Sequence, residues 1–243
     1  MTQTAARRTY SKRSLHGQVA HDLGRRIIGG SYPEGSLLPN EEELSTELDV
    51  SRTALREAIK VLTAKGLIVS RPKIGTKVRP RGDWNMLDPD VLEWTIQTSD
   101  LTVFSRKLIE MRDMIEPAAA GLAARNHRPE QAVELVEAYR AMDASQTHQD
   151  WSAADLRFHQ AMLSATGNEL VGALGTLIET ALITSFDYSA RHARKPKESL
   201  ILHRDVLDAI LSRDPAAATQ AMEVLLTDAR EAIDRIAAAQ AGS

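Results

Sequence analysis

The chain has 243 residues, of which 43% are hydrophobic, 26% charged and 4% aromatic. It contains no cysteine, which excludes disulfides, thiolate metal sites and a cysteine nucleophile and fits a reducing compartment. Its apolar runs are shorter than the roughly 20 residues of a membrane span, and its basic first residues lack the apolar stretch of a signal peptide. We therefore expect a cytoplasmic, mainly α protein of one or two domains, with no membrane segment.

The formal net charge of −3 is unevenly distributed. The first 82 residues hold 15 lysines and arginines against 8 acidic residues, whereas the rest of the chain holds 15 against 25. A basic segment attached to an acidic one favours a polyanion-binding module joined to a second domain. A solvated basic surface would give the same charge balance.

Hydrophobic spacing in the first 82 residues predicts three helices followed by a two-stranded hairpin. The helices are expected over about 15–28, 41–48 and 52–65, and the strands over 67–70 and 76–79. Asn40 and Ser51 are suitable N-caps for the second and third helices. This order of elements predicts a winged helix-turn-helix domain over 1–82.

Residues 83–100 are predicted to form a linker with a short helix from about Pro89. Trp84 and Trp94, which lie in this segment, are expected to anchor it against the second domain.

From residue 101 onward only helical periodicity remains. Helices are expected over 101–124, 129–144, 150–166, 168–190, 197–212 and 215–240, separated by Gly- and Pro-containing breaks. Six or seven antiparallel helices predict a bundle over 101–243.

The third helix carries the residues expected to meet DNA. Its apolar stripe faces the core, so Arg52, Thr53 and Arg56 project outward near the N-terminal end, the end that enters the major groove in a helix-turn-helix. Ser51 and the free N–H groups of the first turn suit a phosphate. On the hairpin we expect contacts to the DNA backbone or minor groove from Arg71, Lys73 and Gly75. The alternative is a solvated amphipathic helix beside a basic hairpin.

Several segments resemble the GntR family of bacterial regulators, with an all-helical FadR-type effector (FCD) domain. The segments that carry the resemblance are Leu37–Leu44, Val50–Ala58, Lys65–Leu67, Gly75–Val78, Glu110–Arg112, Glu116–Pro117, Asp155–His159, Gly167–Asn168 and Leu202–Ile210. Residues 84–94 are also similar to the linker of galactonate-responsive repressors. Many relatives carry arginine where Glu42 stands, threonine at Ala54 and glycine at Lys73.

The resemblance implies a ligand-responsive regulator, a repressor that binds double-stranded operator DNA as a homodimer. A small carboxylate or sugar-acid effector would release it from the operator. Two other classes stay open: a metal-dependent hydrolase or lyase that uses the bundle's Asp/His cluster, and a nucleoid protein without a ligand.

Asp155 and His159 are four residues apart, so they project from one face of a helix and can share a divalent ion. The resemblance adds His203 as a third ligand for Zn²⁺, Ni²⁺ or Mn²⁺ and implies that these three residues also contact the effector. It places a fourth histidine where this chain has Leu225. Alternatively, Asp155 and His159 form an ordinary helix pair and His203 is a core histidine.

Arg112 lies among apolar residues of the first bundle helix. An arginine in such surroundings requires an anion, and the resemblance implies that Arg112 holds the effector's carboxylate. An internal salt bridge to Glu116 or Asp113 is the alternative.

Overall fold

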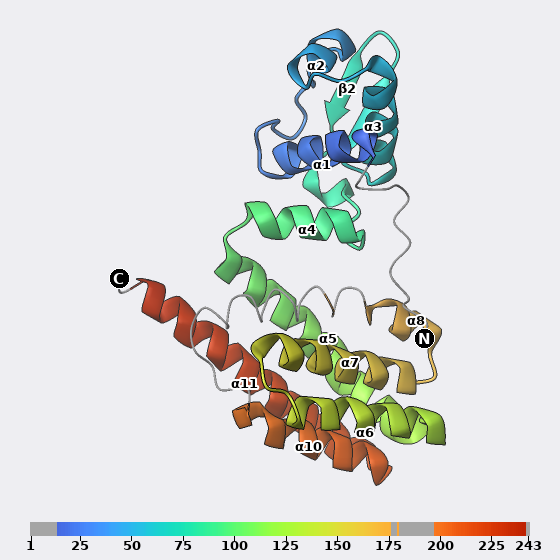
Figure 1. Ribbon diagram of the computed structural model, residues 1–243, viewed down its shortest axis with the longest axis vertical. Coiled ribbons are helices and arrows are strands. Elements are labelled where there is room, and N and C mark those ends of the chain that lie inside the picture. The colour runs from blue at the N-terminus through green and yellow to red at the C-terminus, as the bar shows by residue number, and fades with distance from the viewer. Residues whose placement is uncertain (1–13, 176–178, 180–196, 242–243) are drawn as a thin grey trace. The chain divides into compact units, whose positions relative to one another are not determined.

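The computed structural model describes residues 14–175, 179 and 197–241 and divides the chain into two compact units, between Asp100 and Leu101 (Figure 1). Each unit has its own core of buried apolar side chains. Among the described residues helices predominate, as predicted, and no helix has both the length and the apolar content needed to cross a membrane.

The N-terminal unit is a winged helix-turn-helix, which confirms the predicted order of elements. Its described residues up to Val78 form three helices and one antiparallel sheet of two strands: α1 (Leu15–Ile28), α2 (Glu41–Glu47), α3 (Arg52–Ala64), β1 (Ile68–Arg71) and β2 (Gly75–Val78). In the sheet, Ile68 pairs with Val78 and Arg71 pairs with Gly75. Asn40 and Ser51 cap α2 and α3 through their side chains, which satisfies N–H groups that the helices leave free.

The segment after the hairpin packs on the helices of the same unit. It forms a short 3₁₀ turn, Arg81–Asp83, and the helix α4 (Pro89–Thr98). Trp84 and Trp94 are buried in the core that α1 and α3 build, so our expectation that they anchor against the second domain is wrong. Trp94 lies on Gly24, where a Cβ would stand only 2.4 Å from its ring. The missing side chain at Gly24 thus makes room for the indole.

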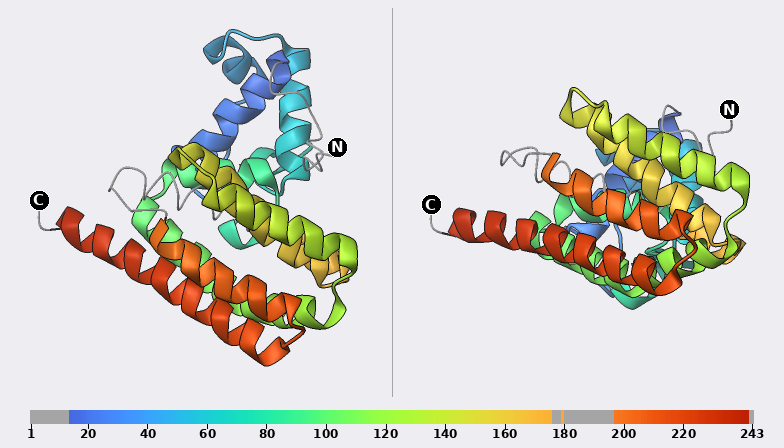
Figure 2. Two further views of the ribbon diagram at one scale, coloured as in Figure 1. Left: turned by 60° about the horizontal axis from the view of Figure 1, so that its bottom comes forward. Right: turned by 90° about the horizontal axis from the view of Figure 1, so that it is seen from below.

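The C-terminal unit is a helical bundle, as predicted. Its described helices are α5 (Leu101–Asn126), α6 (Pro129–Asp143), α7 (His148–Ala165), α8 (Glu169–Ala173), α10 (Lys197–Leu211) and α11 (Pro215–Ala241). The long helices lie alongside one another in both views of Figure 2, and α5 packs on α11 as α6 packs on α7. The helix predicted over 168–190 is described only in part: α8 ends at Ala173, Leu174 forms a turn, and Gly175 and Glu179 are again helical. Residues 176–178 and 180–196 lie outside the described part.

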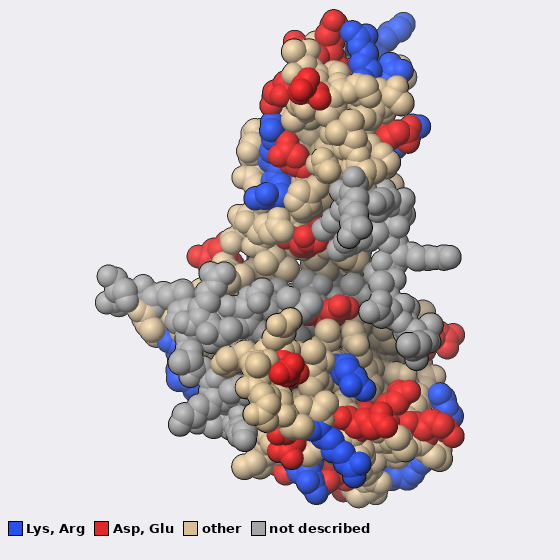
Figure 3. Space-filling view, viewed as in Figure 1, with Lys and Arg blue, Asp and Glu red and all other residues tan. Residues whose placement is uncertain are grey.

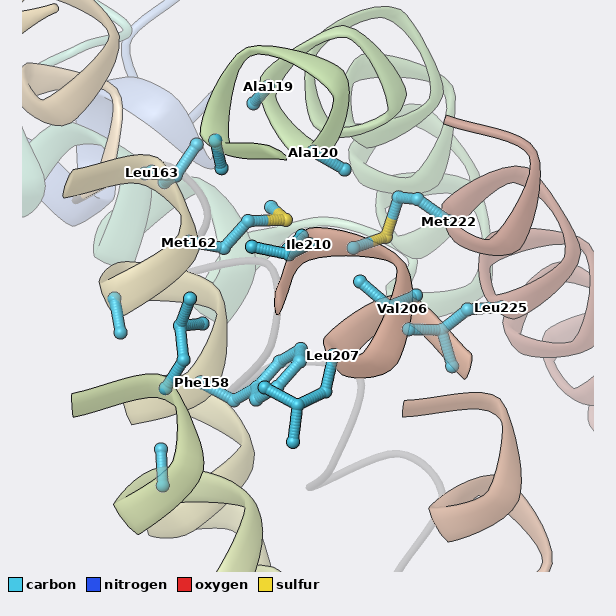
Figure 4. Close-up of a cluster of buried hydrophobic side chains, with 14 of the residues drawn as sticks. Ala119, Ala120, Phe158, Met162, Leu163, Val206, Leu207, Ile210, Met222 and Leu225 are labelled. Atoms are coloured by element: carbon cyan, nitrogen blue, oxygen red, sulfur yellow. The ribbon is translucent and has the colours of Figure 1, made fainter. Parts of the chain in front are cut away.

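The bundle core joins side chains from α7, α10 and α11. Met162, Val206, Met222 and Leu225 face one another in Figure 4, and all four are buried. The same unit also buries polar side chains, among them Asp155, His159 and His203, so their contacts are formed away from water.

Candidate functional site

The start of α3 presents polar side chains to solvent. Arg52, Thr53 and Arg56 are exposed, while Leu55 of the same turn is fully buried. The hydroxyl of Ser51 accepts a hydrogen bond from the backbone N–H of Ala54 at 3.2 Å, so it acts as the helix cap. These positions match the outward face that the sequence predicts.

Two glutamates from α2 reach the arginines of α3. A carboxylate oxygen of Glu42 lies 3.2 Å from a terminal nitrogen of Arg52, and Arg56 Nε donates to Glu41 Oε2 at 2.9 Å. The sequence does not indicate these pairs, because their members are 10 and 15 positions apart and no local periodicity connects them.

The hairpin residues Arg71, Lys73 and Gly75 are all exposed near the β1–β2 turn. Gly75 has a φ of 104° and Lys73 a φ of 65°. The first of these values suits glycine, whereas the second is uncommon for a residue with a side chain.

In the bundle, Asp155 and His159 of α7 and His203 of α10 come together, as the resemblance implies. The three side chains are buried, and one ligand atom from each lies within 4.8 Å of the other two. Asp155 Oδ1 lies 2.8 Å from His203 Nε2, and Asp155 Oδ2 lies 3.8 Å from His159 Nε2. Burial raises the pKa of the Asp155 carboxyl, but the neighbouring histidines and Arg112 more than offset this, so the pKa lies below its usual value.

The residues of this cluster fit a divalent metal ion. His203 Nδ1 donates to the carbonyl of Ser199 at 2.8 Å, which leaves Nε2 as the nitrogen that can bind a metal. His203 Nε2 and His159 Nδ1 are buried without an aligned hydrogen-bond partner, although a carboxylate oxygen lies 2.8 Å from each. In a tetrahedral site, metal–ligand bonds of about 2.1 Å place neighbouring ligand atoms about 3.4 Å apart, which lies between the 2.8 Å and 3.8 Å that separate Asp155 oxygens from the two histidines.

Arg112 forms a buried ion pair with Glu116. This is one of the internal salt bridges that the sequence offered as an alternative to an effector carboxylate. Its Nε donates to Glu116 Oε1 at 2.6 Å, and its Nη2 lies 3.2 Å from Oε2 and 3.3 Å from His159 Nε2. Burial raises the pKa of Glu116, but the charge of Arg112 and the contact with His159 outweigh it and lower the pKa to about 2. Asp113, the other possible partner, pairs with Arg230.

Glu116, which the sequence offers only as an alternative partner of Arg112, also contacts the Asp/His cluster. It is fully buried and contacts both Arg112 and His159, so it links the arginine to the Asp/His cluster. Its spacing of four residues from Arg112 was the available signal. Leu225, which stands where relatives have a histidine, packs in the apolar core (Figure 4), so it offers no ligand atom.

Two family models match the chain: bacterial regulatory proteins of the gntR family over residues 15–78, and the FCD domain over residues 107–228. The regulator YieP of Escherichia coli is 32% identical over 91% of this chain and 96% of its own. The galactonate operon transcriptional repressor of E. coli is 32% identical over 90% of this chain and 96% of its own. A solved GntR protein of Streptococcus agalactiae has a TM-score of 0.51 at 26% identity, covering 89% of this chain and 99% of its own. This chain therefore belongs to the GntR family, as a DNA-binding transcriptional regulator with an FCD domain and not an enzyme.

Proposed function

We propose that this regulator is a repressor that leaves its operator when the bundle binds a small organic or sugar acid. The observation that carries the proposal is the buried polar cluster of the bundle, which contains Arg112, Glu116, Asp155, His159 and His203. Burying charges in a core is unfavourable unless they are paired or bind a ligand, and two ring nitrogens here lack an aligned partner. The similarity to a galactonate operon repressor favours a sugar acid as the ligand.

Within this proposal, Asp155, His159 and His203 hold Zn²⁺, Ni²⁺ or Mn²⁺. The ion would act as a Lewis acid and bind carboxylate or hydroxyl oxygens of the effector. Arg112 currently contacts His159 Nε2, so we expect this contact to be replaced when a metal occupies that nitrogen. Glu116 would keep the guanidinium in place.

Elemental analysis tests the metal assignment. After identical dialysis, we expect close to one divalent ion per wild-type chain and none in His159→Ala. His127→Ala is the matched control, because His127 is also a buried histidine of the bundle but its Nδ1 contacts the carbonyl of Ala123. Leu225→His should retain metal more tightly, since it adds a fourth ligand. A wild type that is free of metal and still responds to its effector would contradict the assignment.

Arg112 is proposed to bind the effector's carboxylate. Glu116 occupies the Nε–Nη2 edge of the guanidinium, so the ligand would approach the Nη1–Nη2 edge and form a second bidentate pair. Glu116 and the ligand would then share one cation, which makes the site selective for a ligand that contributes further hydroxyl contacts.

For DNA, we propose that Arg52 and Arg56 contact base edges and that Ser51 and Thr53 lie at the phosphate backbone. Arg71, Lys73 and Gly75 of the hairpin would follow the backbone or the minor groove. Arg52→Ala and Arg56→Ala should each weaken binding to a selected duplex by about 1–3 kcal/mol.

Effector response can be separated from DNA binding in a gel-shift assay. A duplex selected from a random pool serves as probe, and galactonate and other sugar acids are added to the complex. Arg112→Lys keeps a positive charge beside Glu116 but lacks the Nη1–Nη2 edge proposed to bind the effector. This variant should therefore bind the duplex normally and stay bound when the effector is added. Arg106→Ala, which removes a charge from the exposed side of α5, should respond like the wild type.

Two results, one from this assay and one from thermal unfolding of the wild type with the same acids, would contradict the proposal. One is release of Arg112→Lys at the wild-type effector concentration, which would remove the arginine from the ligand site. The other is the absence of any thermal stabilisation of the wild type by the tested acids, since a ligand that binds only the native state raises its stability.

A further inference from the structure

The first turn of α2 carries three consecutive glutamates, Glu41, Glu42 and Glu43, beside the helix proposed to meet DNA. Glu43 has a local role, because its side chain accepts the backbone N–H of Asn40 at 3.0 Å in a capping box. Glu41 and Glu42 extend instead to α3. Figure 3 shows acidic and basic side chains close together on the end of the N-terminal unit that carries α2.

Both pairs are exposed and leave each arginine able to move. The side chains of Arg52 and Arg56 are 61% and 63% exposed, and those of Glu42 and Glu41 are 77% and 49% exposed. Exposed pairs of this kind are weak, so a competing acceptor on DNA can displace the carboxylate. While the pair lasts, it restricts where the guanidinium points.

The carboxylates affect specific and non-specific DNA binding differently. Non-specific binding depends on the net positive charge that meets the phosphates, and each glutamate both repels phosphates and neutralises an arginine. A guanine in the major groove offers two acceptors that match the planar fork of arginine. A guanidinium that is already oriented loses less freedom when it meets such a base.

We propose that Glu41 and Glu42 are positioning residues that determine specificity by holding Arg56 and Arg52. They lower the affinity for DNA of arbitrary sequence and leave the affinity for the operator nearly unchanged. This inference rests on the proposed contacts of the two arginines with base edges.

The test measures binding by fluorescence anisotropy with the full chain and two probes. One is a random-sequence duplex of about 24 base pairs, long enough for two half-sites one helical turn apart, and the other is a duplex of that length selected with the wild type. Glu41→Gln and Glu42→Gln should each bind the random duplex about two- to fivefold more tightly. Binding to the selected duplex should change less than about twofold, so the specificity ratio falls.

Glu57→Gln is the matched control, because Glu57 lies on α3 and pairs with Lys60 at 2.7 Å rather than with Arg52 or Arg56. It should leave the specificity ratio unchanged. A double-mutant cycle then separates an effect through the arginine from a general effect of charge. In the Arg52→Ala background, Glu42→Gln should have no further effect on the specificity ratio.

Three outcomes would overturn the inference. Equal effects of Glu57→Gln and Glu42→Gln on the random duplex would reduce the role of Glu42 to net charge. If Glu42→Gln and Arg52→Ala change the specificity ratio additively, and Arg52→Ala weakens binding to the selected duplex, the role of Glu42 is refuted but the proposed base contacts are not. Unchanged binding of the selected duplex by both Arg52→Ala and Arg56→Ala would refute the proposed base contacts together with it.

Discussion

At the tip of the hairpin, Lys73 is held with a φ of 65°, a conformation that is less favourable for a side-chain-bearing residue than for glycine. A glycine at this position would avoid that cost. The proposed contact of the Lys73 ammonium group with DNA phosphate would offset the backbone strain only when DNA is bound.

Lys73→Gly should therefore change stability and DNA affinity in opposite directions. We expect the free energy of unfolding to rise by about 1 kcal/mol, because the strain at this residue is removed. We also expect affinity for a random duplex to fall and the salt dependence of binding to decrease by about 0.9 of a counterion. Lys73→Ala is the control, since it loses the charge and keeps the strain. Urea denaturation and anisotropy titrations at several salt concentrations measure both effects; equal affinity of wild type and Lys73→Gly would remove Lys73 from the DNA surface.

In the bundle, Arg112 and Glu116 form a buried ion pair whose contribution to stability can be tested. Glu116 is fully buried and Arg112 is 4% exposed, and removal of one member of such a pair leaves the other charge unpaired in the core. We expect Glu116→Gln to destabilise the bundle by about 3–5 kcal/mol. Glu110→Gln, an exposed change on the same helix, should have little effect.

The double variant Arg112→Met/Glu116→Leu distinguishes pairing from packing. It removes both charges, so it should unfold at a urea concentration closer to that of the wild type than Glu116→Gln does. A double variant that is less stable than Glu116→Gln would show that the pair stabilises the bundle through more than mutual neutralisation.

At the scale of elements, the sequence predicted helix positions well where caps and breakers mark them. Ser51 and Gly66 enclose α3, and proline begins α6 and α11. The sequence did not predict that α4 packs on α1. That packing depends on contacts between residues far apart in the chain, such as Trp94 with Gly24, and hydrophobic periodicity carries no information about such pairs.

The same limit applies to the sites. Asp155 and His159 were predictable because one helix turn separates them, whereas His203 entered only through the family resemblance. The pairs formed by Glu41 and Glu42 had neither a local spacing nor a family pattern to indicate them.

The helix α4 is held to the end of α3 by a buried cluster of charges. Lys65 Nζ lies 2.7 Å from Asp88 Oδ1 and 2.9 Å from Asp90 Oδ2, and Lys65 and Asp90 are 3% and 1% exposed. On the other side, the Trp94 indole N–H donates to His21 Nδ1 at 2.8 Å. These contacts make α4 part of the DNA-binding unit, so a movement of α4 would carry α3 with it.

Lys65→Met should loosen α4 more than the rest of the chain. It removes the ammonium group from the buried carboxylate of Asp90 and the partly buried one of Asp88, and breaking a buried ion pair costs about 3–5 kcal/mol. In hydrogen-exchange measurements on the full chain, we expect α4 amides to exchange about a hundredfold faster or more, with the bundle helices unchanged. Lys60→Met, an exposed change on α3, is the control. Equal protection of α4 in wild type and Lys65→Met would show that the apolar contacts of Trp94 hold the helix alone.

For the whole molecule, the charge asymmetry of the sequence only partly follows the division into two units. The basic first 82 residues contain the winged helix-turn-helix, but the segment that joins them in the same unit, residues 83–100, adds five acidic and no basic residues. The N-terminal unit therefore holds 15 basic residues against 13 acidic ones, and the bundle that contains the buried cluster holds 15 against 20. Coupling between the two sites requires that effector binding favours one arrangement of the units over another. A single chain with one DNA-binding unit could couple the two sites only weakly, because its contacts with DNA span a single half-site.

The regulator is therefore expected to act as a homodimer formed through the bundle. A two-fold dimer contacts two half-sites about one helical turn apart, which roughly doubles the number of base contacts and makes their spacing sensitive to a shift between subunits. The bundle leaves large apolar side chains exposed, among them Met114 at 75% and Ile201 at 69%, which are available to a second copy. In sedimentation experiments, the full chain and residues 101–243 alone should both be dimers at micromolar concentration, and two chains should bind one selected duplex. If residues 101–243 sediment as a monomer while the full chain is a dimer, the bundle is not the dimerisation element, and the effector would have to act on the DNA-binding units by another route.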